Sequence, residues 1–279
     1  MIQEKTFPNG FKYLEIENSS ATAKVALQGG HLFHYQVHGQ EPLLWLSEKS
    51  YFETGKAIRG GVPICWPWFG KHSSNSALPQ HGFARTSEFT LLEVNEKDTS
   101  CTELTLQLES SAASFALWPY HFQLQLHISI GQSLTIALTT SNCGSSDFTI
   151  SSALHTYYMV SEIGNTSIKG LDGLKYRNFL TSTCAKQDGL LIINEEVDRV
   201  YDGINTPLTL NDLNRSIQIS SMGSSSAVIW NPWKDKSRQI DDMADDAYKT
   251  MLCIETAIVG NDSRKILAGS QHILKTTIR

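Results

Sequence analysis

The segment LPQHGFARTSEFTLLEV (78–94) places a histidine, a glycine and an arginine in a short break before a strand-like run. An imidazole can exchange protons near neutral pH, and a guanidinium can bind an anion through paired hydrogen bonds. If residues 81–85 are extended, His81, Phe83 and Arg85 lie on one side of the chain. The pattern therefore predicts His81 and Arg85 side by side at the mouth of a strand.

Glu255 interrupts the apolar segment YKTMLCIETAIVG (248–260). In a strand it shares a face with Cys253 and Ala257, while Leu252 and Ile254 fill the other face. A carboxylate among such neighbours is costly unless it is paired or lines a wet pocket, and burial raises its pKa. These properties suit a general base, and the alternative is a buried structural salt bridge.

His155 lies in the segment SSALHTYYMVSE (151–162). In extended form Ala153, His155 and Tyr157 point one way, and the small Ala153 leaves space beside the imidazole. A site for acid–base chemistry is one interpretation, and an incidental strand histidine is the other.

The segment AIRGGVPICWPWFGKH (57–72) follows Arg59 with a glycine pair, two prolines and three large aromatic residues. The glycines permit a positive φ or a close approach of backbone, and the prolines remove backbone donors. Trp66, Trp68 and Phe69 can stack on the apolar face of a sugar ring, or they can plug the end of a β-sandwich. Rigid loops of this kind often carry function.

The histidines of GGHLFHYQVHGQ (29–40) invite a test for a metal site. A strand divides His31, His34 and His38 between its two faces, and no acidic or cysteine ligand is near. We therefore expect no metal here. The chain also lacks G-x-S-x-G, G-x-x-x-x-G-K-[ST], H-E-x-x-H and G-x-G-x-x-G, so common hydrolase, nucleotide-binding and metalloprotease motifs are missing.

The elements that must position these residues have a period of two. Apolar and polar residues alternate in TELTLQLES (102–110), FQLQLHISI (122–130) and SLTIALTTSN (133–142), as in half-buried antiparallel strands. PLTLNDLN (207–214) and DDMADDAY (241–248) are interpreted as short turns or helices. The pattern predicts an all-β fold, a large antiparallel β-sandwich that forms a single domain over residues 1–279.

The composition limits the classes of partner. The 279 residues are 41% hydrophobic, which is enough for a large core without metals or disulfides. The net charge of −5, without any basic stretch among aromatics, argues against nucleic acid and anionic membranes. Five separated cysteines and the absence of a signal-like start favour a cytoplasmic location. The oligomeric state stays open, and the pattern is compatible with a monomer.

Six segments in order carry a family resemblance: AIRGGVPICWPWFGKH, LPQHGFAR, ALHTYY, VDRVYDG, VIWNPW and MLCIETA. With them the chain resembles, over nearly its whole length, the glucose-6-phosphate 1-epimerases, which are the D-hexose-6-phosphate mutarotases of the aldose 1-epimerase superfamily. The resemblance implies a galactose-mutarotase-like β-sandwich that interconverts the anomers of a hexose 6-phosphate without a cofactor.

The resemblance also assigns roles to matching residues. It implies that His155 is the general acid and Glu255 the general base. It implies substrate binding by five further residues, which are Arg59, Gln80, His81, Arg85 and Asp202.

A phosphosugar partner would explain the arginines. A phosphate carries about −1.5 to −2 charges at neutral pH, and guanidinium groups match its oxygens. We therefore expect Arg59 and Arg85, from two loops at one end of the sandwich, to form a phosphate clamp. An aldose 1-epimerase for unphosphorylated sugars and a non-catalytic carbohydrate-binding β-sandwich remain alternatives. The presence of both His155 and Glu255 favours an enzyme, because binding alone needs no acid–base pair.

Overall fold

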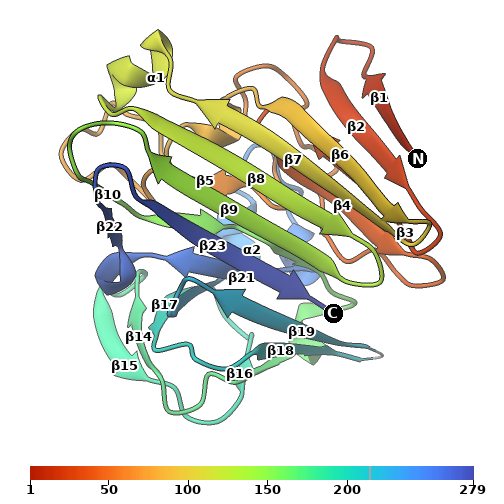
Figure 1. Cartoon of the computed structure of the whole chain (residues 1–279). Helices are drawn as coiled ribbons and strands as arrows, with labels where there is room; N and C mark the ends of the chain where they lie inside the picture. Colours follow the sequence, from red (N-terminus) through yellow and green to blue (C-terminus); the bar gives the residue numbers. More distant parts are fainter. Residues whose placement is uncertain (214) are drawn as a thin grey trace.

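A nine-stranded antiparallel sheet spans one face of the computed structural model, which describes residues 1–213 and 215–279. Its long strands run side by side across Figure 1. Their spatial order is β16 (Leu191–Ile192), β13 (Ser167–Lys169), β18 (Leu208–Asp212), β19 (Arg215–Met222), β23 (Gln271–Ile278), β9 (Leu134–Asn142), β8 (Phe122–Ile130), β7 (Cys101–Glu109) and β6 (Thr90–Asp98). The predicted strands in 102–110, 122–130 and 133–142 are confirmed as β7, β8 and β9.

An eight-stranded antiparallel sheet carries the residues that matter for chemistry. Its order is β15 (Thr183–Lys186), β14 (Lys175–Asn178), β17 (Val197–Asp202), β20 (Ser226–Asn231), β21 (Met251–Ile258), β11 (Ser152–Leu154) and β5 (Ile64–Cys65), and β12 (Tyr157–Met159) also pairs with β21. Two smaller sheets complete the β structure. One has four strands, β1 (Ile2–Thr6), β2 (Lys12–Glu17), β3 (Ala21–Ala26) and β4 (His31–Val37), and the other pairs β10 (Phe148–Ile150) with β22 (Arg264–Ile266).

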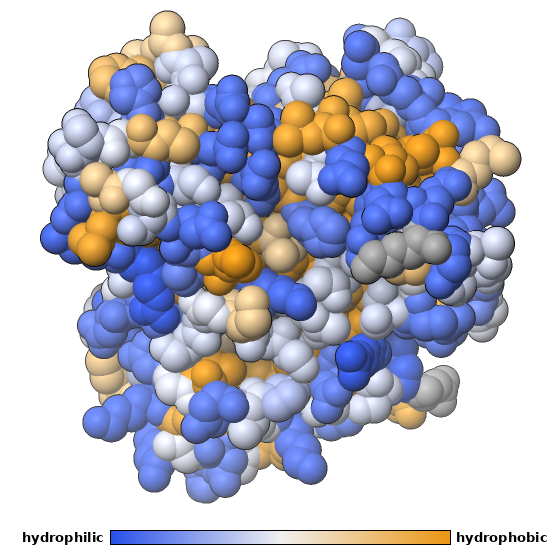
Figure 2. All heavy atoms as spheres, in the orientation of Figure 1, coloured by the Kyte–Doolittle hydropathy of each residue, from blue (hydrophilic) through white to orange (hydrophobic). Residues whose placement is uncertain are grey.

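The main core draws on all four of these sheets. In β8 and β9 every second residue is buried, and these residues join side chains of β3, β4, β17 and β21 in one apolar cluster. Each buried leucine or isoleucine contributes about 1.5–3 kcal/mol of transfer free energy. In the view of Figure 1, polar residues cover much of the surface and apolar residues form separate groups (Figure 2). The alternation in the sequence thus separates the core side of this sheet from its outer side.

Helices are short and serve as connections. They are α1 (Ala112–Leu117), α2 (Trp233–Ser237) and the 3₁₀ turns η1 (Ala84–Thr86), η2 (Ile163–Asn165), η3 (Ala247–Lys249) and η4 (Gly260–Asp262). None of the helices in the described part of the chain has the length and apolar character needed to cross a membrane. The interpretation of 207–214 as a turn or helix was wrong, because β18 pairs there with β13 and β19; Asn214 lies outside the described residues. The segment 241–248 does form turns that lead into η3.

Strand β21 is the element that links core and site. All eight of its residues are buried, so the sheet is covered on both faces at this strand. Leu252 and Ile254 join the main core, as predicted, together with Ile258, and Cys253 and Ala257 belong to two smaller clusters on the opposite face. Glu255 lies on that opposite face, between Cys253 and Ala257.

Candidate active site

A cavity of about 990 Å³ lies against this second face of the eight-stranded sheet. Six of the seven predicted site residues line it: Arg59, Gln80, His81, Arg85, His155 and Glu255. They come from the loops around β5, from the end of β11 and from β21. The structure therefore brings together side chains that lie up to 196 positions apart in the sequence.

The register of the strands forms the floor of this cavity. Val228 of β20 is paired with Glu255, Val200 of β17 with Val228, and Arg177 of β14 with Val200. Directly paired residues of antiparallel strands point to the same face, so these four side chains form one row. The ends of the row are three strand spacings apart, which is about 14 Å across the sheet. Two buried valines lie between the carboxylate and the arginine.

His155 and Glu255 form the centre of the site. Nε2 of His155 lies 3.3 Å from Oε1 of Glu255, and the two residues are 9% and 1% exposed. His155 lies between β11 and β12, which both pair with β21, and its backbone N–H donates to the carbonyl of Pro63. The imidazole is therefore fixed opposite the carboxylate by the pairing of the strands.

Burial controls the protonation of this pair. It raises the pKa of Glu255 well above its ordinary value, because ionisation is unfavourable in an apolar surrounding. It lowers the pKa of His155 well below its ordinary value, and electrostatic interactions with His81, Arg59 and Arg85 act in the same direction. The neutral pair, a carboxylic acid beside a neutral imidazole, is thus favoured over the ion pair.

The pair also has hydrogen-bonding capacity that the protein does not use. Both carboxylate oxygens of Glu255 and Nδ1 of His155 are buried without a hydrogen-bond partner among the described residues. Leaving a buried polar atom unsatisfied costs about 1–3 kcal/mol. Hydroxyl groups of a ligand in the cavity would satisfy these atoms, so the arrangement suits a polyhydroxylated molecule.

His81 is held in a tight turn, which the sequence interpretation missed. It has a φ of 65°, and Gly82 has a φ of 72°, so residues 81–85 are not extended and the predicted alternation of faces was wrong. A Cβ atom at position 82 would lie 1.9 Å from the carbonyl oxygen of Trp66, so only glycine fits there. The turn still directs His81 and Arg85 into the same cavity.

The hydrogen bonds of His81 fix its tautomer. The backbone N–H of Gly70 donates to its Nδ1 at 3.2 Å, so the neutral ring carries its proton on Nε2. Burial and the charges of Arg85 and Arg59 lower the pKa of His81 to about 3. Nε2 lies 3.2 Å from the side-chain amide of Gln80, so both ring nitrogens of His81 have partners within the protein. The neutral ring lies at the cavity wall, with its centroid 5.9 Å from that of His155.

The two predicted clamp arginines have different surroundings. Arg59 donates through Nε to Asp242 at 3.0 Å and through Nη1 to the hydroxyl of Tyr157 at 3.2 Å. Arg85 donates to the carbonyl of Gln80 at 2.8 Å and makes no ion pair with any residue that the structure describes. The charge of Arg59 is therefore balanced within the protein, and the charge of Arg85 stays available to a ligand.

The glycine pair after Arg59 behaves as predicted. Gly60 and Gly61 have φ values of 115° and 62°. A Cβ atom at either position would lie within 2.5 Å of a carbonyl oxygen, that of Trp45 or of Leu32. This close packing of backbone holds Arg59 at the rim of the cavity.

The aromatic residues divide between the two roles considered for them. Trp66 is completely buried and packs against Phe83 and Trp118 in the main core, and Trp68 is also buried. Only Phe69 of these three lines the cavity. The tryptophans therefore stabilise the end of the sandwich, and Phe69 is the aromatic residue available to a sugar.

Asp202 is the predicted site residue that the structure does not bring to the others. It lies at the end of β17, paired with Ser226, and is absent from the described lining of the cavity. Asp198, four residues earlier on the same face of β17, does line the cavity. Burial, and then the carboxylate of Glu196, raise the pKa of Asp198 to about 6.

Sequence reasoning also missed cavity residues that lie outside the six quoted motifs or were given no role in them. Among them are Arg177, Tyr157, Trp230 and Lys236. The register of β14, β17 and β20 brings Arg177 to the cavity, and no local pattern indicates that register. The strand alternation in the sequence places Tyr157 on the same side as His155, and this could have indicated a role in the site.

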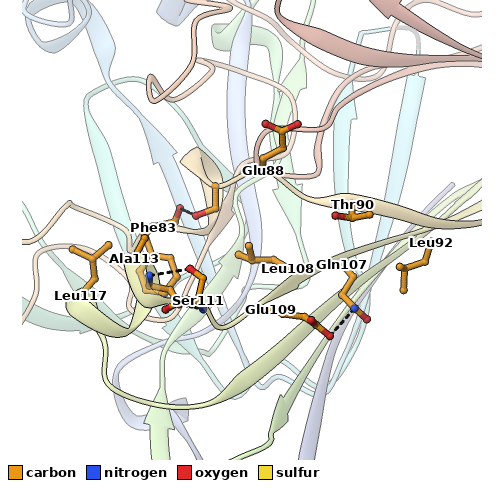
Figure 3. A pocket seen from close by; sticks show the side chains of 12 residues that line it. Phe83, Glu88, Thr90, Leu92, Gln107, Leu108, Glu109, Ser111, Ala113 and Leu117 are labelled. Carbon is orange, nitrogen blue, oxygen red and sulfur yellow. Dashed lines mark hydrogen bonds between the residues drawn. The ribbon is translucent and has the colours of Figure 1, made fainter.

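A second cavity, of about 600 Å³, lies between η1, the start of β6 and α1 (Figure 3). Its charged lining residues are Glu88 and Glu109, and Glu109 accepts a hydrogen bond from Gln107 at 2.9 Å. None of the predicted site residues lines it. The acid–base pair therefore belongs to the cavity on the eight-stranded sheet.

Comparison with known proteins agrees with this geometry. The model of the family described as Aldose 1-epimerase matches residues 12–279. A protein of Escherichia coli (strain K12) named "Putative glucose-6-phosphate 1-epimerase" is 36% identical over 270 residues, which cover 95% of this chain and 88% of that protein. A protein of the same name from Salmonella typhimurium is 38% identical over 247 residues, which cover 86% of this chain and 81% of that protein. The crystal structure of "a putative mutarotase" from Salmonella typhimurium has a TM-score of 0.93 and 33% identity, and the match covers 99% of this chain and 92% of that one.

Proposed function

The chain belongs to the aldose 1-epimerase family, and we propose that it interconverts the α and β anomers of a hexose 6-phosphate, with glucose 6-phosphate as the preferred substrate. The observation that carries the proposal is the buried pair of His155 and Glu255, 3.3 Å apart, in a cavity that also holds an arginine free of ion pairs among the described residues. Two relatives named for glucose 6-phosphate support the choice of sugar.

The reaction needs one proton removed and one proton supplied. The base takes the proton of the C1 hydroxyl while the acid protonates the ring oxygen, so that the C1–O5 bond breaks and the open-chain aldehyde forms. Rotation about C1–C2 and reclosure by the reverse steps give the other anomer. Nε2 of His155 is close enough to Oε1 of Glu255 for the carboxyl proton to pass to it, and this transfer gives the carboxylate base and the imidazolium acid.

The rest of the cavity orients the sugar. Phe69 and the buried Val228 offer apolar surface to the ring face, and the neutral imidazole of His81 lies at the same wall, paired with the Gln80 side chain. Gln80 and Asp198 lie at the wall and can accept hydrogen bonds from sugar hydroxyls. Each positioned group lowers the entropy cost of bringing C1 to the pair.

Arg59 and Arg85 are the proposed phosphate contacts, and Arg85 supplies the larger uncompensated charge. Replacing Arg85 by Ala should raise KM for glucose 6-phosphate about tenfold or more, because charge-assisted hydrogen bonds are lost, and should leave KM for free glucose unchanged. Steady-state kinetics with both sugars measures the effect. Arg85→Lys keeps the positive charge but removes the planar guanidinium group, so it separates the two contributions to phosphate binding. Equal losses for the two sugars would mean that Arg85 does not hold the phosphate.

Turnover should depend on the buried pair. We expect Glu255→Gln to lower kcat about 10²- to 10⁴-fold, with a much smaller change in KM, because the isosteric amide cannot take a proton. Saturation-transfer NMR of α-glucose 6-phosphate measures the rate directly, with free glucose run in parallel. Glu88→Gln, in the second cavity, is the matched control.

Each outcome of this NMR experiment discriminates between functions. Acceleration of the phosphosugar alone supports the hexose-6-phosphate reaction, and equal acceleration of glucose supports an aldose 1-epimerase for unphosphorylated sugars. A folded protein that accelerates neither sugar is a binding module, and unchanged turnover in Glu255→Gln removes this residue from the mechanism.

We also propose a cytoplasmic location. All five cysteines are free in the structure, and two of them, Cys65 and Cys253, are buried near Glu255, where burial raises their pKa. Free thiols persist in a reducing compartment such as the cytoplasm.

A further inference from the structure

Tyr157 lies between the two halves of the proposed site. On one side its ring is nearly parallel to the imidazole of His155, with centroids 4.9 Å apart and planes at 12°. On the other side it stacks on Trp45 at 5.9 Å and 21°. Trp230 meets both His155 and Tyr157 edge-on, at 6.2 Å and 6.0 Å. The imidazole therefore forms the outer layer of an aromatic stack whose base is buried.

The hydroxyl group of Tyr157 acts in the other half of the site. It accepts the hydrogen bond from Nη1 of Arg59 at 3.2 Å, while Asp242 accepts from Nε of the same guanidinium. Asp242 is itself held, because its carbonyl accepts from the hydroxyl of Ser47 at 2.6 Å. Both hydrogen-bond partners of Arg59 are thus fixed, and they hold its guanidinium group in one orientation.

The backbone around Tyr157 makes this geometry rigid. Its N–H donates to the carbonyl of Gly61 at 2.9 Å, and its carbonyl accepts from the N–H of Trp45 at 3.0 Å. The loop that carries Arg59 and the strand that carries the tyrosine are therefore joined by main chain as well as by side chains. Tyr157 is 2% exposed, so its ring has little freedom to move.

We propose that Tyr157 is a positioning residue with two separable roles: its ring sets the plane of the His155 imidazole, and its hydroxyl holds Arg59 toward the anionic end of the substrate. The proposal rests on the proposed function. Stacked aromatic pairs are stabilised beyond their burial, and misplacing a catalytic group by about 1 Å can cost 10²-fold in rate. A free arginine side chain populates many rotamers, so its hydrogen-bond partners are what hold it in one.

The two roles predict different kinetic effects for two variants. Tyr157→Phe keeps the stack and removes the hydroxyl, so it should raise KM for glucose 6-phosphate about tenfold while kcat stays within about twofold. Tyr157→Leu removes both, so it should also lower kcat about tenfold or more. Asp242→Ala, which removes the other partner of Arg59, should resemble Tyr157→Phe. Tyr158→Phe is the matched control, because Tyr158 is buried in the main core on the opposite face of the strand.

Two further measurements do not need turnover. Calorimetric binding of glucose 6-phosphate should weaken in Tyr157→Phe and stay unchanged in Tyr158→Phe. The NMR resonances of the His155 ring should move in Tyr157→Leu and stay in place in Tyr157→Phe, because they sense the ring current of the neighbour.

The outcomes separate the two roles from each other and from the proposed function. Unchanged KM and affinity in Tyr157→Phe would overturn the role of the hydroxyl. Equal kcat in the Phe and Leu variants, with unmoved His155 resonances, would overturn the role of the ring. A wild-type protein that binds glucose 6-phosphate without accelerating its anomers would refute the proposed function, while binding and NMR would still decide both roles of Tyr157.

Discussion

At the scale of the residue, burial determines which groups in the cavity carry charge. Burial lowers the pKa values of His155 and His81 and raises the pKa of Glu255, so it favours the neutral form of all three groups. Asp198 and cations such as Arg85 and Arg177 can present opposite charges to a ligand in the same cavity. Shifted pKa values that cluster in one cavity are typical of a catalytic site.

Asp198 should give substrate binding a pH dependence. Its pKa of about 6 means that the carboxylate, which accepts sugar hydroxyls, predominates above pH 6 and is lost as the pH falls below it. KM for glucose 6-phosphate should therefore rise as the pH falls from 7 to 5. The substrate phosphate also titrates in this range, so free glucose, which has no phosphate, serves as the reference sugar. Asp198→Asn should raise KM at pH 7 and remove this inflection.

Asp202→Asn is the matched comparison, because both aspartates lie on the same face of β17. If Asp202 rather than Asp198 contacts the sugar, Asp202→Asn will raise KM and Asp198→Asn will not. The pair of variants thus decides between the position expected from the motif and the position that lines the cavity.

At the scale of the element, strand pairing aligns the chemical groups. Glu255, Val228 and Arg177 occupy one row because β21, β20, β17 and β14 are in register, and a shift of one residue would turn each side chain to the other face. The loops are positioned by glycines instead. Gly61 and Gly82 let the chain pass against neighbouring backbone where no side chain fits.

Gly61→Ala should be strongly destabilising. The new Cβ would lie 2.4 Å from the carbonyl oxygen of Leu32, and the φ of 62° disfavours any side chain. We expect a loss of more than about 2 kcal/mol in the free energy of unfolding, measured by denaturant titration. Gly164→Ala is the control, because no atom lies within 4 Å of a Cβ there and its φ is not positive. Similar stabilities for the two variants would contradict this account of the loop.

At the scale of the whole molecule, one apolar cluster connects the sheets. It includes residues of the four-stranded sheet such as Leu32, of the nine-stranded sheet such as Leu126, and of the eight-stranded sheet such as Ile254. One contiguous core that links all the sheets, with smaller clusters beside it, is typical of a single domain. We therefore propose that residues 1–279 form a single domain.

A single domain should unfold in one cooperative step. The six tryptophans include Trp66 in the main core and Trp45 in the cluster beside the cavity, so fluorescence reports on both regions. Fluorescence and far-ultraviolet circular dichroism should give coincident denaturant transitions. Two separated transitions would show that the cluster around Trp45 unfolds independently.

The sequence by itself was enough to identify the class of fold and the chemistry. Period-two alternation is a local property of a half-buried strand, so β7, β8 and β9 could be located from their residues alone. An isolated glutamate in an apolar strand, as at Glu255, is also visible locally, since burial of a carboxylate is costly in any fold. The family resemblance then joined it to His155.

Only the tertiary structure decided which side chains meet. Asp198 and Asp202 share a face of one strand. Periodicity predicts this face, but it does not predict which position along the strand lies at the cavity. The pairing of Arg59 with Asp242, 183 positions away, and of Tyr157 with Arg59 depends on how loops from different strands converge. The left-handed turn at His81 is stabilised by Gly70 and Trp66, which local propensity does not include. Local patterns reflect burial of single residues, whereas the site is built from contacts between segments that only the folded chain brings together.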